Sequence, residues 1–241
     1  MKLAFKIQYK GTNYSGFQSQ KNANSIQDEL IKAFKRISVD NLQMNYSGRT
    51  DKGVHALGQV FDVVVSQDRS DMQWINGLNS NLPNDISVVD LERVEDSFHS
   101  RFDAIDRTYS YLIFNSPSRN VLLDDFYYWE KAELDINKMN EESKYLIGKH
   151  DFTSFRSLSC GSNNPERNVK EIEINKLGDI IEIKITANVF LQNMVRIIVG
   201  TLLEIGKYQI KISLKEILES KDRNNAGTTI NPRGLILLGP G

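Results

Sequence analysis

The chain has 241 residues, of which 40% are apolar and 25% charged, and its formal net charge is −1. This is the composition of an ordinary globular protein, and the length suits two domains of about 100–130 residues better than one. No apolar run reaches the roughly 18–20 residues of a membrane span, no signal-peptide core is present, and a single cysteine excludes a disulfide framework, so we expect a cytoplasmic protein.

The first half of the chain predicts strand, helix, strand, strand, helix, strand. The first strand alternates apolar and polar side chains, and the first helix has Ser25 as its N-cap and a single apolar stripe. The predicted ranges are 3–9, 26–37, 43–46, 59–65, 71–82 and 86–91. This order is that of a split βαβ, or ferredoxin-like, unit.

The second half again mixes strands with helices, as a degenerate repeat of the first. Its predicted strands are 109–114, 126–129, 169–175, 180–186 and 234–238, and its predicted helices are 134–147, 189–204 and 213–221. The glycine-containing turn at 176–179 predicts a hairpin. We therefore expect an α+β fold with two ferredoxin-like domains, residues 1–104 and 105–241, each with a mainly antiparallel sheet.

Charge is unevenly distributed along the chain. Residues 1–60 carry a balance of +5, residues 61–155 of −9 and residues 156–241 of +3. The two basic ends are able to form a phosphate-binding surface although the average is not basic. The alternative, that these charges only form solvated faces, is the commoner case and stays open.

Residues 47–56, SGRTDKGVHA, form the most informative segment of the chain. It places one carboxylate, Asp51, among glycines that permit sharp backbone turns. Arg49, two residues away, favours the ionised form of that carboxylate. These are properties of a nucleophile or general base, although an aspartate can also simply shape a tight turn.

From Gly48 to Ala56 this segment resembles, without interruption, the catalytic signature of the tRNA pseudouridine synthase A family, Gly-Arg-Thr-Asp-x-Gly-Val-His-Ala. The resemblance implies that uridine is isomerised to pseudouridine in the anticodon stem-loop of tRNA, at positions of about 38 to 40, with Asp51 as the catalytic residue. It also implies a homodimer and a cleft between two ferredoxin-like halves whose sheets lie side by side. The reaction transfers no electrons, so we expect no cofactor and no metal.

Supporting residues in the second half are also implied by the resemblance. Tyr109 matches the active-site tyrosine, although Tyr111 lies on the same strand face and one of the two could belong to the core. Arg196 matches an arginine that pairs with the catalytic carboxylate, and snorkelling to the surface is the alternative. Leu235 is expected to line the uracil pocket, with a core role equally open.

RNA contacts are expected from several polar residues of the first half. Arg49 matches the arginine that braces the gap left by a flipped uridine, with an ion pair to Asp51 as the alternative. The other candidates, all close to the signature or to similar family-like segments, are Gln18, Lys52, His55 and Arg101. The polar loop at 157–168 could face RNA or merely connect two elements.

Two other functions stay open at this point. The first is a non-catalytic RNA-binding protein on the same fold, against which Asp51 argues because a carboxylate repels phosphates. The second is a synthase that acts on other uridines or on another RNA. A metal enzyme is disfavoured, since the three histidines are scattered and no metal-ligand spacing occurs.

Overall fold

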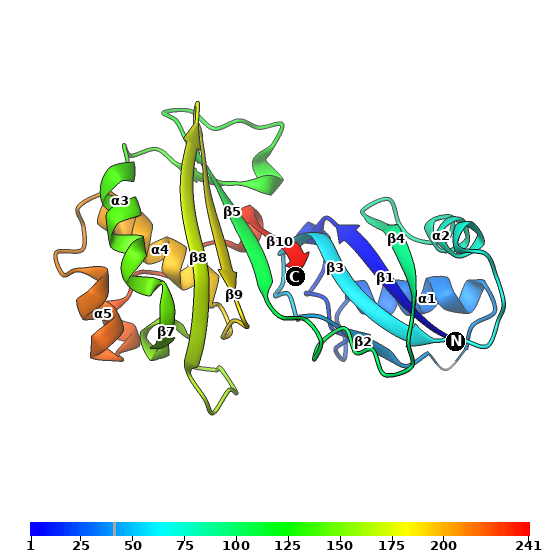
Figure 1. Ribbon diagram of the computed structural model, residues 1–241. Coiled ribbons are helices and arrows are strands. Elements are labelled where there is room, and N and C mark those ends of the chain that lie inside the picture. The colour runs from blue at the N-terminus through cyan, green and yellow to red at the C-terminus, as the bar shows by residue number, and fades with distance from the viewer. Residues whose placement is uncertain (41) are drawn as a thin grey trace. The chain divides into compact units, whose positions relative to one another are not determined.

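The computed structural model describes residues 1–40 and 42–241. The chain divides into two compact units, one of Met1–Ile105 with Ile236–Gly241 and the other of Asp106–Leu235 (Figure 1). Each unit packs helices against mainly antiparallel strands, which confirms the predicted α+β class. Within the described part of the chain, no helix combines the length and apolarity needed to span a membrane.

The first unit follows the predicted order of strands and helices. Its elements are β1 (Lys2–Tyr9), α1 (Ile26–Arg36), β2 (Met44–Tyr46), β3 (His55–Val64), α2 (Asp71–Asn79) and β4 (Ile86–Val94). β1 lies between β3 and β4 and is antiparallel to both, while β2 pairs antiparallel with β3. A last strand, β10 (Leu235–Pro240), pairs in parallel with the beginning of β3.

Aromatic side chains form the core of the first unit. Phe5 of β1 stacks on Phe61 of β3 with ring centroids 5.1 Å apart. Phe34 of α1 and Trp74 of α2 both meet the ring of Phe5 edge-on, at 5.6 and 6.5 Å. Both helices therefore cover the same face of the sheet, and burial of these four rings contributes several kcal/mol of hydrophobic stabilisation, at about 25 cal/mol per Å².

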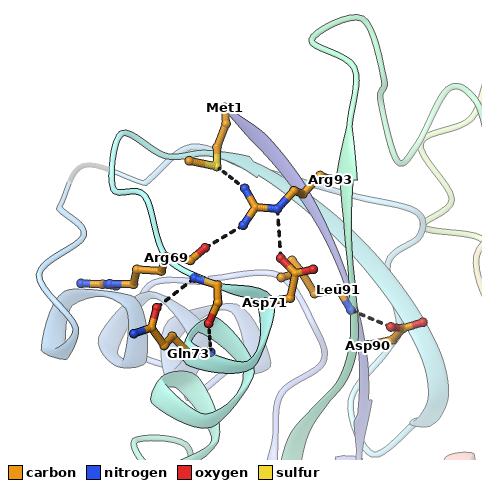
Figure 2. A network of polar contacts seen from close by, with 8 residues as sticks. Met1, Arg69, Asp71, Gln73, Asp90, Leu91 and Arg93 are labelled. Atoms are coloured by element: carbon orange, nitrogen blue, oxygen red, sulfur yellow. Dashed lines mark hydrogen bonds and ion pairs between the residues drawn. The ribbon is translucent and has the colours of Figure 1, made fainter.

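One polar network joins β4 to the first turn of α2 and to the N-terminus (Figure 2). Arg93 donates through Nε to Asp71 at 3.0 Å and through Nη2 to the carbonyl of Arg69 at 2.7 Å. Its Nη1 lies 3.1 Å from the sulfur of Met1. Because the Arg93–Asp71 ion pair is exposed, we expect it to contribute at most about 1 kcal/mol.

The second unit contains the remaining strands and helices. They are β5 (Arg107–Asn115), β6 (Tyr128–Glu130), α3 (Ile136–Ser143), β7 (Gly148–Asp151), β8 (Glu166–Leu177), β9 (Ile180–Ala187), α4 (Met194–Gly206) and α5 (Leu214–Ser220). β9 lies between β5 and β8 and is antiparallel to both, β7 pairs with β8, and β6 pairs in parallel with β5. The predicted hairpin at 176–179 joins β8 to β9.

The core of the second unit lies between its sheet and its helices. Alternate residues of β5 and β9 are buried: Tyr109, Tyr111, Ile113, Ile181, Ile183 and Ile185. In Figure 1, α3, α4 and α5 lie together on one side of the β5–β9–β8 sheet. α4 is buried along almost its whole length, as expected for a helix that is apolar all round.

The start of α4 was predicted wrongly. The apolar pattern predicts a helix from residue 189, whereas α4 begins at Met194. The Asn188 side chain accepts the backbone N–H of Val189 at 2.9 Å and that of Asn168 in β8 at 3.0 Å, which ties this stretch to the sheet. Asn193 then adopts a left-handed conformation, with φ of 61°, directly before the helix. The side-chain bonds of Asn188 and the left-handed conformation of Asn193 thus outweigh the apolar periodicity.

Candidate active site

The signature segment forms the connection between β2 and β3 in the first unit. At its beginning, the backbone N–H of Ser47 donates to the carbonyl of Val60 at 2.9 Å, and its hydroxyl donates to Gln59 at 2.6 Å. The Gln59 amide in turn donates to the carbonyl of Gly48 at 2.6 Å. The first half of the loop is therefore fixed to β3.

The second half of this loop is fixed by the segment that follows β1. The backbone N–H of Phe17 donates to the carbonyl of Thr50 at 3.2 Å, and the N–H of Gly53 donates to the carbonyl of Tyr14 at 3.3 Å. Gly16 has a φ of +96°, and a Cβ there would lie 2.5 Å from the Thr50 carbonyl oxygen. The two backbones approach each other this closely because residue 16 has no side chain.

Asp51 stands at the turn of this loop. Its backbone carbonyl accepts the N–H of Val54 at 3.2 Å, which closes the turn through the main chain. The Asp51 side chain is half-buried, while Arg49 and Lys52 on either side are exposed. The loop thus carries one half-buried carboxylate between two exposed cations in the sequence.

His55, predicted to contact RNA, is buried at the start of β3 and only 2% exposed. Its Nδ1 accepts the backbone N–H of Gly11 at 3.1 Å, which fastens the segment after β1 to β3. This bond requires an unprotonated Nδ1. A contact with RNA stays a prediction for His55, and also for Gln18, whose half-buried side chain follows Phe17.

Arg101 lies in the segment after β4, and its side chain is exposed. A contact of Arg101 with RNA stays a prediction.

The buried Asp62 of β3 accepts several hydrogen bonds. Ser100, the neighbour of Arg101, donates its backbone N–H to Asp62 at 2.8 Å. The buried Asp62 also accepts from Asn45 at 2.9 Å and lies 3.5 Å from the ammonium of Lys2. Burial raises the pKa of Asp62, but the bonds from Ser100 and Asn45 and the charge of Lys2 together hold this pKa below its ordinary value.

We expect Asp62→Asn to destabilise the protein at pH 7 by about 1–3 kcal/mol, since the amide replaces a charged acceptor of several hydrogen bonds. A lowered pKa means that the carboxylate stabilises the fold above its unfolded pKa and loses this effect as the pH falls through the folded pKa. Thermal unfolding of both proteins should therefore differ at pH 7, and the difference should begin to shrink only below about pH 4, as the pH falls towards the lowered folded pKa. The exposed Asp90→Asn is the control; a difference that persists in acid would contradict the explanation.

Tyr109 and Tyr111 can be separated by their surroundings in β5. Tyr111 is fully buried and donates its hydroxyl to the carbonyl of Asn231 at 2.6 Å, and burial raises its pKa. It is therefore a core residue. The ring of Tyr109 meets that of Phe190 edge-on at 5.2 Å, beside the chain that leads to α4. The catalytic support predicted for Tyr109 is compatible with this position.

Arg196 lies in the first turn of α4 and is half-buried. Its Nε donates to the carbonyl of Ile230 at 2.8 Å, and its Nη1 donates to Asn193 at 2.8 Å. These bonds fix the planar guanidinium at the helix start instead of leaving it to extend along the surface. Leu235, the first residue of β10, is buried. The role of residues 193 and 230 in holding Arg196 escaped the sequence patterns.

The candidate residues thus form two groups. The first unit carries Gln18, Arg49, Asp51, Lys52, His55 and Arg101, and the second carries Tyr109, Arg196 and Leu235. Among the residues that the structure describes, no group of three or more histidine, cysteine, aspartate or glutamate side chains is placed to hold a metal ion.

A comparison with known families identifies the chain. The model of a family described as tRNA pseudouridine synthase matches residues 6–103 and 143–240. The chain belongs to the tRNA pseudouridine synthase family. The matched ranges contain every candidate site residue of the first unit, together with Arg196 and Leu235, whereas Tyr109 falls in the gap between them.

Individual tRNA pseudouridine synthases resemble the chain over nearly its whole length. A tRNA pseudouridine synthase A from Francisella tularensis subsp. tularensis is 41% identical over 235 residues, covering 97% of this chain and 91% of the relative. One from Francisella philomiragia is 42% identical with the same coverage. One from Hydrogenovibrio crunogenus is 41% identical over 237 residues, with coverage of 98% and 90%.

Proposed function

We propose that this chain isomerises uridine to pseudouridine in the anticodon stem-loop of tRNA, at positions of about 38 to 40, and that Asp51 is the catalytic residue. As a member of the tRNA pseudouridine synthase family, the chain is an isomerase. The observation that carries the assignment of Asp51 is the unbroken signature at 48–56, held on both sides by hydrogen bonds to β3 and to the segment after β1.

The chemistry explains why one carboxylate can be sufficient. The bond between C1′ and N1 of uridine breaks, the uracil turns, and a bond forms between C1′ and C5. C5 then loses its proton and N1 gains one, so atoms balance and no electrons are transferred. Asp51 acts by attack at C1′, by attack at C6 or by removal of a sugar proton, three alternatives that share the need for an ionised and well-placed carboxylate.

The second unit is proposed to complete the pocket between two ferredoxin-like halves. In this proposal Tyr109 stacks on the uracil, Arg196 pairs with Asp51, and Leu235 lines the pocket. The guanidinium of Arg196 suits a bidentate pairing because Ile230 and Asn193 already fix its plane. The assignment of these roles rests on the family resemblance.

The substrate must be drawn out of its stem before C1′ can be reached, at a cost of a few kcal/mol. We propose that the exposed Arg49 stabilises the gap in the RNA that the flipped uridine leaves, by stacking on bases or binding phosphate. Gln18, Lys52, His55 and Arg101 are the further candidates for RNA contacts. We also propose that the enzyme acts as a cytoplasmic homodimer, as the resemblance implies.

Arg49→Ala should lower the turnover number by about 10-fold or more and weaken tRNA affinity only slightly. The reason is that a side chain that braces the flipped state contributes mainly after binding. Single-turnover rates and tRNA binding constants, measured at one salt concentration, separate the two effects. Lys35→Ala is the matched control, since it removes an exposed cation of the same unit outside the loop. A loss confined to affinity would reduce Arg49 to a phosphate contact.

The proposed function is tested by incubating the protein with unmodified anticodon stem-loop RNA and locating pseudouridine by chemical labelling and mass spectrometry. Substrates in which each of the three uridines is replaced singly by cytidine identify the modified position. Pseudouridine at these positions is the expected result. Binding without product would favour the RNA-binding alternative, and product only in another RNA or at another position would favour a different target.

A further inference from the structure

We propose that the hydroxyl groups of Tyr9 and Thr50 form a clamp that positions Asp51 for catalysis. The inference rests on the proposed function of Asp51 and names two residues that support it from outside the pocket. The Tyr9 and Thr50 hydroxyl oxygens lie 2.8 Å apart and are hydrogen-bonded. Both side chains are nearly inaccessible, with 4% and 6% of their surfaces exposed, so they act through the loop rather than by touching RNA.

The clamp acts on the peptide directly before Asp51. The hydroxyl of Thr50 is held by Tyr9, and its carbonyl accepts the N–H of Phe17 at 3.2 Å. The side chain and the main chain of Thr50 are thus each held by a separate hydrogen bond. Asp51 is the next residue, and its Cα lies about 3.8 Å from that of Thr50. The position of Asp51 on this side therefore depends on both bonds, and loss of either one frees Thr50 to shift.

The base of the clamp is rigid. Tyr9 is the last residue of β1 and is paired with Ala56 on β3 and with Ile86 on β4. Its ring also packs on that of Phe17 at a centroid distance of 6.2 Å. A phenylalanine at position 9 would keep this pairing and packing and lose only the hydroxyl. The bond can therefore be removed without removing the side chain.

The two hydroxyls are buried together, so single and double variants should affect the free energy of unfolding and the catalytic rate differently. Removing one leaves the other without this partner in a buried site, at a cost of about 1–3 kcal/mol, whereas removing both leaves no such lone hydroxyl and should cost less. Catalysis responds differently, because a displacement of about 1 Å can cost 10²-fold in rate. A single variant should therefore lose stability and rate, and the double variant should regain only stability.

The test measures kcat, KM for tRNA and melting temperature for Tyr9→Phe, Thr50→Val and their combination. We expect kcat to fall about 10-fold or more in all three, with KM unchanged. The double variant should fall no further than the singles, because both changes remove the same bond. Thr50→Ser keeps the hydroxyl and should retain kcat.

Tyr127→Phe is the matched control. Tyr127 is also buried, and its hydroxyl bonds to the carbonyl of Asn120 in the second unit, so this variant loses a buried hydroxyl without touching the Asp51 loop. The clamp would be overturned by a double variant that regains both stability and kcat, or by single variants whose kcat equals that of Tyr127→Phe. Neither result would affect the proposed function, which would still stand on an active wild type and an inactive Asp51→Asn. A wild type that makes no pseudouridine would overturn the proposed function and the clamp with it.

Discussion

Asp51→Asn should abolish pseudouridine formation, with a loss of at least about 10³-fold in turnover. Asparagine has nearly the same shape but cannot attack as an anion or accept a proton as a base. The main-chain bond from the N–H of Val54 to the carbonyl of residue 51 is unchanged by this substitution. A loss of activity with an unchanged melting temperature would therefore report chemistry and not folding.

The measurement compares single-turnover product formation and tRNA binding for the wild type, Asp51→Asn and Asp68→Asn. Asp68 is exposed and lies outside the loop, so this control changes the net charge equally. We expect Asp51→Asn to bind tRNA as well as the wild type or better, since one carboxylate facing phosphates is neutralised. Retention of full activity in this variant would refute the proposed role of Asp51.

Helix starts were predictable wherever their cause is local. Ser25 was predicted as an N-cap, and it accepts the backbone N–H of Asp28, three residues further on. A cap needs only a short polar side chain and the next turn of the same helix, so its signal is contained in a few residues. The start of α4 failed because Asn193 takes a left-handed conformation that apolar periodicity does not report.

In the candidate site, too, the sequence reveals local features but not contacts between distant residues. Asp51 could be proposed from the sequence because its signature is contiguous. Its supports could not, because they are distant along the chain: Tyr9 bonds to Thr50, 41 residues away, and Gly11 bonds to His55, 44 residues away. Such contacts depend on the pairing of β1 with β3, and a hydroxyl or imidazole within an apolar stretch gives no sign of its partner.

Gly16→Ala should lower the melting temperature by about 5–15 °C, which corresponds to roughly 2–5 kcal/mol. At φ of +96° a side chain is strained, and the new Cβ would lie 2.5 Å from the Thr50 carbonyl oxygen and 3.3 Å from the carbonyl carbon of Asp51. Both contacts are with backbone, so no side-chain rotation relieves them. Because the peptides that must move carry Asp51, turnover should fall together with stability.

Gly48→Ala provides the control from the same loop. A Cβ at Gly48 meets no atom within 4 Å, and this residue has no positive φ. Its melting temperature should stay within about 2 °C of the wild type, as for surface substitutions in general. Equal stability of the two variants would show that the segment after β1 does not constrain the Asp51 loop. A stable Gly48→Ala beside a destabilised and slow Gly16→Ala would instead mean that the position of Asp51 depends on this close backbone contact.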